Sequence, residues 1–190
     1  MTVADRLSAS AHDFERLVWP VIKDALGGGR VVPVETVAEA EFARDLDVLA
    51  GIDVWHIAQG DAGIRGIASR IQWGHRNWRT FTVRYSRRSG YATEYHKRCA
   101  ALNGGHGFLY PHITVQAYID KRPDGALLGC GMAYTSDVIA LADPDNESRR
   151  RTNPQDGSTF LVVSYDDLKA AGRRLYEHTV EHAEAPPEAA

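Results

Sequence analysis

The sequence contains little cysteine, since Cys99 and Cys130 are its two thiols in 190 residues. Two cysteines are too few for a disulfide framework, so the cytoplasm is the expected location. No apolar run approaches the roughly 20 residues that a membrane-spanning helix requires. The first ten residues lack a positive end followed by an apolar block. We therefore expect neither a secretory signal nor a membrane partner.

Several catalytic and metal-binding motifs are also missing. No G-x-G-x-x-G or G-K-[ST] segment is present, so no phosphate loop of the nucleotide-binding type is expected. His96, Cys99, His106 and His112 do not have the spacing of a structural zinc site. No nucleophile elbow supports Ser-His-Asp catalysis. The sequence therefore contains no motif that indicates an enzyme acting on small molecules.

Charge is unevenly distributed along the chain. The net charge of −3 argues by itself against a nucleic-acid partner. Between Ile64 and Cys99, however, nine basic residues accompany a single acid, Glu94, so this stretch carries +8 and the rest of the chain −11. The basic residues are Arg65, Arg70, Arg76, Arg79, Arg84, Arg87, Arg88, Lys97 and Arg98. Such asymmetry indicates a surface that attracts polyanions.

Hydrophobic periodicity predicts one α/β domain of α+β character over residues 1–182, followed by a disordered tail at 183–190. The expected architecture is a central mixed sheet with a β-meander, flanked by helices. The expected meander consists of Gly51–Ala58, Gly63–Trp73 and Arg79–Ser86. Further strands are expected at Arg30–Val37, Ile113–Ile119, Ala126–Tyr134 and Thr159–Ser164, and helices at Ala11–Ala25, Thr93–Leu102, Asp137–Ala142 and Asp166–His182.

Asp53 is unusual because the strand around it (GIDVWHIA) is otherwise largely apolar. Burying a carboxylate is costly unless it is paired or binds a metal. Arg70 and Gln72 share one face of the next strand by the two-residue period, so both are expected near Asp53. Two interpretations remain open. Asp53 bonds to turn amides or to Arg70, or it belongs to a metal or phosphate site.

Three segments together resemble the PD-(D/E)XK nuclease superfamily: FERLV at 14–18, GIDVW at 51–55 and IASRIQ at 67–72. The resemblance covers roughly residues 11–99, and small phage and mobile-element proteins are nearest in arrangement. It implies a restriction-endonuclease-like fold and Mg²⁺-dependent cleavage of phosphodiester bonds. It also implies that Glu15, as the helix acid, and Asp53, as the strand acid, are the metal ligands.

The chain departs from the superfamily where an acid and a lysine are expected, because Ala68 and Arg70 stand there. Ala68 offers no ligand to Mg²⁺, which is usually held by one or two carboxylates. Arg70 can stabilise charge on a phosphate, but a pKa above about 12 prevents it from moving protons. Either the chain is an active nuclease, or the fold is retained for binding. The candidate catalytic residues are Glu15, Asp53, Arg70 and Gln72.

Aromatic residues alternate with the basic ones in the same stretch. Arginine forks bind phosphates bidentately and exposed aromatic rings stack on bases, although Phe81, Val83 and Tyr85 also fit the core face of a strand. The sequence therefore predicts a nucleic-acid-binding protein, acting on DNA, with Mg²⁺-dependent phosphodiesterase activity as its catalytic form. The candidate backbone contacts are Arg76, Arg79, Arg84, Arg87, Arg88 and Lys97. The alternative is a catalytically inactive protein-binding module, a phage or mobile-element inhibitor or assembly factor, that directs its basic surface at an acidic protein.

Overall fold

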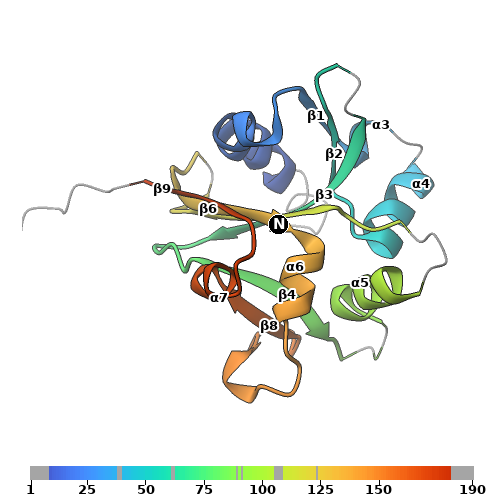
Figure 1. Cartoon of the computed structure of the whole chain (residues 1–190), viewed down its shortest axis with the longest axis vertical. Helices are drawn as coiled ribbons and strands as arrows, with labels where there is room; N and C mark the ends of the chain where they lie inside the picture. Colours follow the sequence, from blue (N-terminus) through green and yellow to red (C-terminus); the bar gives the residue numbers. More distant parts are fainter. Residues whose placement is uncertain are drawn as a thin grey trace, which may run out of the picture.

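The computed structural model describes residues 9–37, 40–60, 63–88, 90, 92–104, 109–122 and 124–180. The predicted tail at 183–190 lies outside these residues, as do Tyr91 and His106. Two sheets are present, with the larger one above the smaller one in Figure 1. The larger sheet has six strands in the order β1-β2-β3-β5-β6-β9, and the smaller has three in the order β4-β8-β7. The predicted α+β character with a mixed sheet is confirmed.

The strands of the large sheet are β1 (Arg30–Pro33), β2 (Val54–Ile57), β3 (Ile64–Trp73), β5 (Ile113–Ile119), β6 (Leu127–Tyr134) and β9 (Leu175–Thr179). Those of the small sheet are β4 (Thr80–Ser86), β7 (Arg150–Thr152) and β8 (Thr159–Ser164). Neighbouring strands run antiparallel except β3 and β5, which are parallel. Parallel strands require a long crossover, and here it contains β4 and α5 (Glu94–Asn103).

The remaining helical elements are short. They are η1 (Phe14–Val18), α2 (Trp19–Ile22), η2 (Asp24–Leu26), α3 (Val34–Val37), α4 (Ala40–Asp45), η3 (Leu46–Ala50), α6 (Thr135–Leu141), η4 (Glu147–Arg149) and α7 (Tyr165–Ala170). Within the described residues, no helix has both the length and the apolar character that crossing a bilayer demands.

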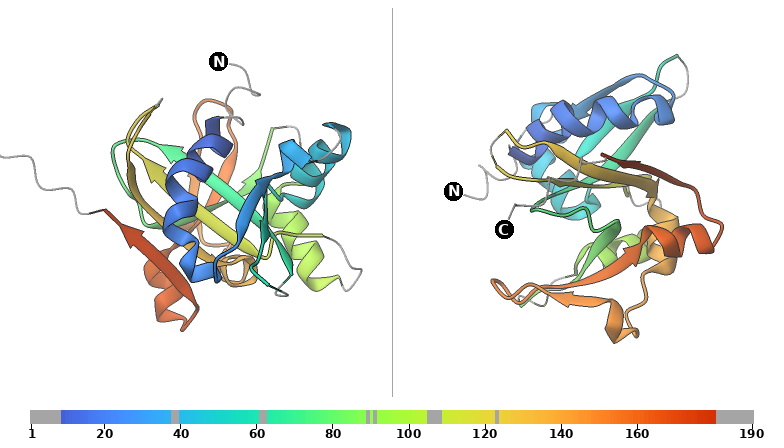
Figure 2. Two further views of the ribbon diagram at one scale, coloured as in Figure 1. Left: turned by 90° about the horizontal axis from the view of Figure 1, so that it is seen from above. Right: turned by 90° about the vertical axis from the view of Figure 1, so that its left-hand side faces the viewer.

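The N-terminal helical segment covers one face of the large sheet, as the two views of Figure 2 show. Phe14 and Val18 are four residues apart, so they lie on the same side of the segment, and both are fully buried. They belong to a core cluster with Ile67 and Ile71 of β3. Gly27, with φ 81°, ends the segment.

The other face of the large sheet turns polar side chains of β5 toward the small sheet. Gln116 Oε1 accepts hydrogen bonds from the backbone N–H and the hydroxyl of Thr82, at 3.3 and 3.1 Å. The hydroxyl of Tyr118 donates to the carbonyl of Thr80 at 2.8 Å. Because β5 is buried along its whole length, these bonds satisfy polar groups that water cannot reach. They tie the two sheets together.

A second core lies against one face of the small sheet. Phe81 and Val83 of β4 are fully buried, and they pack with residues of β8, α6 and α7. The interpretation of these two side chains as a core face is therefore confirmed. Tyr165, also fully buried, links this core to the large sheet, because its ring lies against Gly131 of β6.

Three predicted elements are corrected by the structure. The strand expected at Arg30–Val37 ends at Pro33, and the rest of this range forms α3. The antiparallel meander consists of β1, β2 and β3, and the expected third strand, Arg79–Ser86, leaves it as β4 and pairs with β8. The turn that redirects the chain includes Arg79, whose backbone has φ 51°. The expected helix at Asp166–His182 stops after α7, at Gly172 with φ 66°, and the chain returns as β9 along β6. Pairing with an open sheet edge outweighs the helical spacing of the sequence.

Candidate functional site

A compact group of charged side chains lies where β3, β4 and α5 meet. Arg70 points from β3 toward α5, on the face opposite to the buried Ile71. Its Nη2 lies 2.5 Å from Oε1 of Glu94, in the first turn of α5. The other oxygen of Glu94 accepts a hydrogen bond from the backbone N–H of Arg84 on β4, at 3.2 Å. One carboxylate therefore connects three elements.

Arg98 and Asp53 complete this group, which we call the Glu94 cluster (Asp53, Arg70, Arg84, Glu94 and Arg98). Arg98 follows Glu94 by one helical turn, so the two share a face of α5. It is 5 % exposed, and its guanidinium lies beside Gly51, which directly follows η3. The negative charges of Glu94 and Asp53 both act on it. Asp53 Oδ2 also accepts a hydrogen bond from the backbone N–H of Ser69, at 2.6 Å.

The positive charges of the cluster dominate its electrostatics. Burial raises the pKa of the Glu94 carboxyl. The charges of Arg70 and Arg98 oppose this effect, as does the backbone N–H of Arg84, so that the pKa falls to about 2. Burial lowers the pKa of the guanidinium groups of Arg84 and Arg98, against the attraction of Glu94. Both remain cationic at neutral pH because the pKa of arginine starts above about 12.

An aromatic ring holds two of these arginines in place. The guanidinium carbons of Arg70 and Arg84 lie 5.0 and 5.3 Å from the ring centroid of Phe160 on β8. Both distances are within the range of a cation–π contact. Arg151 of β7 is the cross-strand partner of Phe160 and is exposed. The guanidinium groups of Arg70 and Arg84 are therefore held in place without a ligand.

Several donors in and beside the cluster lack an acceptor. Among the described residues, Arg84 Nε and Arg98 Nε are buried without a hydrogen-bond partner. The same holds for Nε2 of Gln116, which is 1 % exposed and pairs with Arg70 across β3 and β5. A buried donor without an acceptor costs about 1–3 kcal/mol.

No protein-family model, curated protein or solved structure matches this chain. The relation to the PD-(D/E)XK superfamily and to its restriction-endonuclease-like fold stays a prediction. The function is therefore argued from the Glu94 cluster itself.

The structure brings together some of the residues that the sequence singled out. Asp53, Arg70 and Arg84 meet in the cluster. Glu94 and Arg98 were missed as site residues, although Glu94 is the one acid among nine basic residues at 64–99. A single acid within a basic stretch is expected to pair with one of the basic residues, and this pattern could have identified Glu94 as a site residue.

Glu15 and Gln72 lie apart from the cluster. Glu15 is exposed on η1, and η1 packs on the face of β3 that carries Ile67 and Ile71. Arg70, at the cluster, points from the opposite face. Gln72 is exposed on the same face as Arg70, one two-residue step further along β3.

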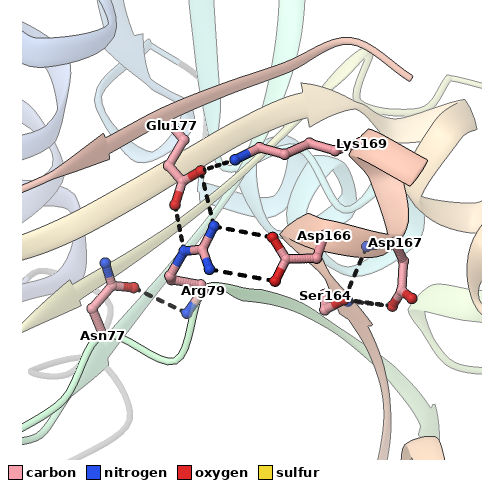
Figure 3. Close-up of polar contacts among 7 residues, drawn as sticks. All are labelled: Asn77, Arg79, Ser164, Asp166, Asp167, Lys169 and Glu177. Atoms are coloured by element: carbon pink, nitrogen blue, oxygen red, sulfur yellow. Dashed lines mark hydrogen bonds and ion pairs between the residues drawn. The ribbon is translucent and has the colours of Figure 1, made fainter. Parts of the chain in front are cut away.

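Arg79 has an internal role, which Figure 3 shows. Its guanidinium bonds to Glu177 of β9, with Nε 2.5 Å from Oε1, and to Asp166 of α7, with Nη2 3.1 Å from Oδ1. Lys169 also reaches Glu177, at 2.6 Å. The bonds from Arg79 and Lys169 lower the pKa of Glu177 to about 2. Arg79 therefore neutralises acids of the C-terminal segment, and its contact with nucleic acid stays a prediction.

The other predicted backbone contacts lie on the surface around these groups. Arg76 is exposed in the loop after β3, and its guanidinium carbon lies 4.7 Å from the ring centroid of Trp78. Arg87 and Arg88 are exposed immediately after β4, and Lys97 is half-buried on α5. These four basic residues therefore lie in the loop after β3, after the end of β4 and on α5, and not on one element.

The carboxylates of the cluster do not fit a magnesium site. Both oxygens of Glu94 are engaged, by Arg70 and by the N–H of Arg84. One oxygen of Asp53 is bonded to Ser69. Across the part of the chain that the structure describes, no three His, Cys, Asp or Glu side chains gather as a metal site requires. Mg²⁺ binding by Glu15 and Asp53 stays a prediction.

Proposed function

We propose that the Glu94 cluster binds the phosphate backbone of a nucleic acid, DNA in the first instance. The observation that carries this proposal is that three guanidinium groups share the charge of Glu94, with Asp53 as the second acid. The cluster keeps a surplus of positive charge, because three guanidinium groups face two carboxylates. A phosphate supplies negative charge and several acceptor oxygens at once.

The fixed positions of the arginines also support phosphate binding. Glu94 holds Arg70, and Phe160 contacts both Arg70 and Arg84. Side chains that are already ordered lose little entropy on binding, which raises affinity without further contacts. The exposed guanidinium groups of Arg87 and Arg88, next along the chain from β4, extend the positive field and speed the encounter with a polyanion.

In this function the chain's own residues bind and orient a phosphate. Arg84 and Arg70 donate to its oxygens, while Glu94 holds the guanidinium of Arg70 and the backbone of Arg84. Arg98 is buried, so it adds positive charge to the site without contacting the phosphate. The predicted nuclease reaction is a separate claim, tested by adding Mg²⁺ or Mn²⁺ to DNA and comparing nicking by the wild type and Asp53→Ala.

Binding is tested by fluorescence anisotropy with labelled single-stranded and duplex DNA at two or more salt concentrations. Arg84→Gln is expected to weaken binding about 10-fold and to make the salt slope shallower by about 0.9 per lost phosphate contact on a duplex. Arg173→Gln is the matched control, because it removes the same charge from a residue paired with Asp137, away from the cluster. Circular dichroism verifies that each variant is folded.

Two outcomes contradict the proposal. The first is that the wild type binds neither form of DNA at low salt, and recovery of an acidic protein partner instead would favour the protein-binding alternative. The second is that Arg173→Gln weakens binding as much as Arg84→Gln. That result would mean that net charge, and not the Glu94 cluster, determines affinity.

A further inference from the structure

The loop between β3 and β4 presents a tryptophan to solvent. Trp78 is 51 % exposed, although large aromatic side chains contribute most to stability when they are buried. Arg76, also exposed, places its guanidinium over the ring of Trp78 at 4.7 Å. An aromatic ring beside a cation on the surface is suited to a ligand with both flat rings and negative charge.

The neighbours of Trp78 hold the loop in a defined position. The side-chain carbonyl of Asn77 accepts a hydrogen bond from the backbone N–H of Arg79, at 3.0 Å. Arg79 is itself bound to Glu177 and Asp166. Trp78 thus lies between two anchored residues, so little ordering is needed before the ring contacts a ligand.

The loop leads directly from the strand of Arg70 to the strand of Arg84. Arg84 lies six positions after Trp78, so at most about 20 Å of chain joins them. The loop of Trp78 connects the end of β3, beyond Arg70 and the exposed Gln72, to the start of β4, which leads to Arg84. Both strands therefore lead from Trp78 to the Glu94 cluster.

We propose that the protein binds single-stranded nucleic acid in preference to duplex, with the Glu94 cluster holding a phosphate and Trp78 stacking on a base of the same strand. This inference rests on the proposed function. In a duplex the bases are stacked on one another and are closed to an aromatic side chain, whereas a single strand exposes their faces. Trp78 can add affinity for the single strand alone.

The test compares Trp78→Ala, Trp78→Phe and the wild type on labelled DNA of about 12 nucleotides, single-stranded and duplex, by anisotropy at fixed salt. Trp78→Ala is expected to weaken single-strand binding about 10-fold and to change duplex binding less than about 2-fold. Trp78→Phe should retain most of the affinity, because a ring remains. The salt slope should not change, because neither substitution alters charge.

Ile64→Ala is the matched control, because Ile64 is 62 % exposed at the opposite end of β3. It is expected to leave both affinities unchanged. The inference is overturned if the wild type binds duplex as tightly as single strand, or if Trp78→Ala weakens both forms equally. If neither form binds, or if Arg84→Gln has no effect, the proposed function fails as well, so the two failures are distinguishable.

Discussion

Arg79 and Glu177 are 98 positions apart in the chain, yet the Nε of one lies 2.5 Å from Oε1 of the other. This ion pair joins the start of β4 to β9, the last described strand of the large sheet. Asp166 and Lys169 extend it into a network of two acids and two bases (Figure 3). The network holds the C-terminal strand against the body of the protein.

Removing Arg79 is therefore expected to affect stability and not duplex DNA binding. Arg79→Gln leaves the half-buried Glu177 with Lys169 as its one cation in the network. We expect it to lower the free energy of unfolding by about 1–2 kcal/mol, measured by urea denaturation. Duplex affinity should stay within about 2-fold of the wild type. A drop as large as that of Arg84→Gln would return Arg79 to the set of phosphate contacts.

Stability should fall steeply in acid, because Glu94 and Glu177 both have a pKa of about 2 in the folded protein. An unfolded glutamate titrates near 4.3, so the folded state binds fewer protons than the unfolded state between these values. The contribution of both carboxylates is complete above about pH 5 and is lost as the pH falls toward 2.

Urea unfolding at pH 7, 5, 4 and 3 measures this dependence. Glu177→Gln should be less stable than the wild type at pH 7, and its stability should decline less between pH 5 and 3. Glu94→Gln should behave in the same way, since its carboxylate is held by Arg70 and Arg98. An equally steep decline in both variants would show that other carboxylates govern acid unfolding.

Gly131 of β6 leaves room for the ring of Tyr165. A Cβ at this position would lie 2.3 Å from the ring, which is too close for the two to coexist. Tyr165 is fully buried and cannot move aside without disturbing the second core. We expect Gly131→Ala to cost about 1–3 kcal/mol of stability.

Gly74→Ala is its control, because a Cβ there meets nothing within 4 Å. It is expected to change the thermal midpoint by a few degrees at most. Equal midpoints for the two alanine variants would contradict the close contact between Tyr165 and β6.

Phe160 is expected to act on ligand binding through the arginines it contacts. Phe160→Leu keeps an apolar side chain on β8 but removes the ring that Arg70 and Arg84 lie over. The two guanidinium groups then gain freedom, and binding has to order them again. We expect DNA affinity to fall about 3- to 10-fold with less than 1 kcal/mol change in stability. Phe160→Tyr, which keeps a ring, should restore most of the affinity.

Much of the fold follows from local patterns in the sequence. Apolar runs of strand length identify β3, β5, β6 and β8, and the spacing of Phe14 and Val18 identifies the N-terminal helix, because these patterns depend on neighbouring residues alone. The pairing of the strand after Asp53 with the strand of Arg70 was also predictable, since β2 and β3 are adjacent along the chain and form a hairpin.

Tertiary structure alone decided where β4 and β9 pair and which acid meets which arginine. The residues at 166–182 have helical spacing, but an open edge of β6 takes Leu175–Thr179 as a strand. Glu94 reaches Arg70 because the crossover helix α5 lies beside β3, and Arg79 reaches Glu177 because β9 returns along the sheet. Charge pairing over such separations depends on which distant segments meet, and no local period encodes that.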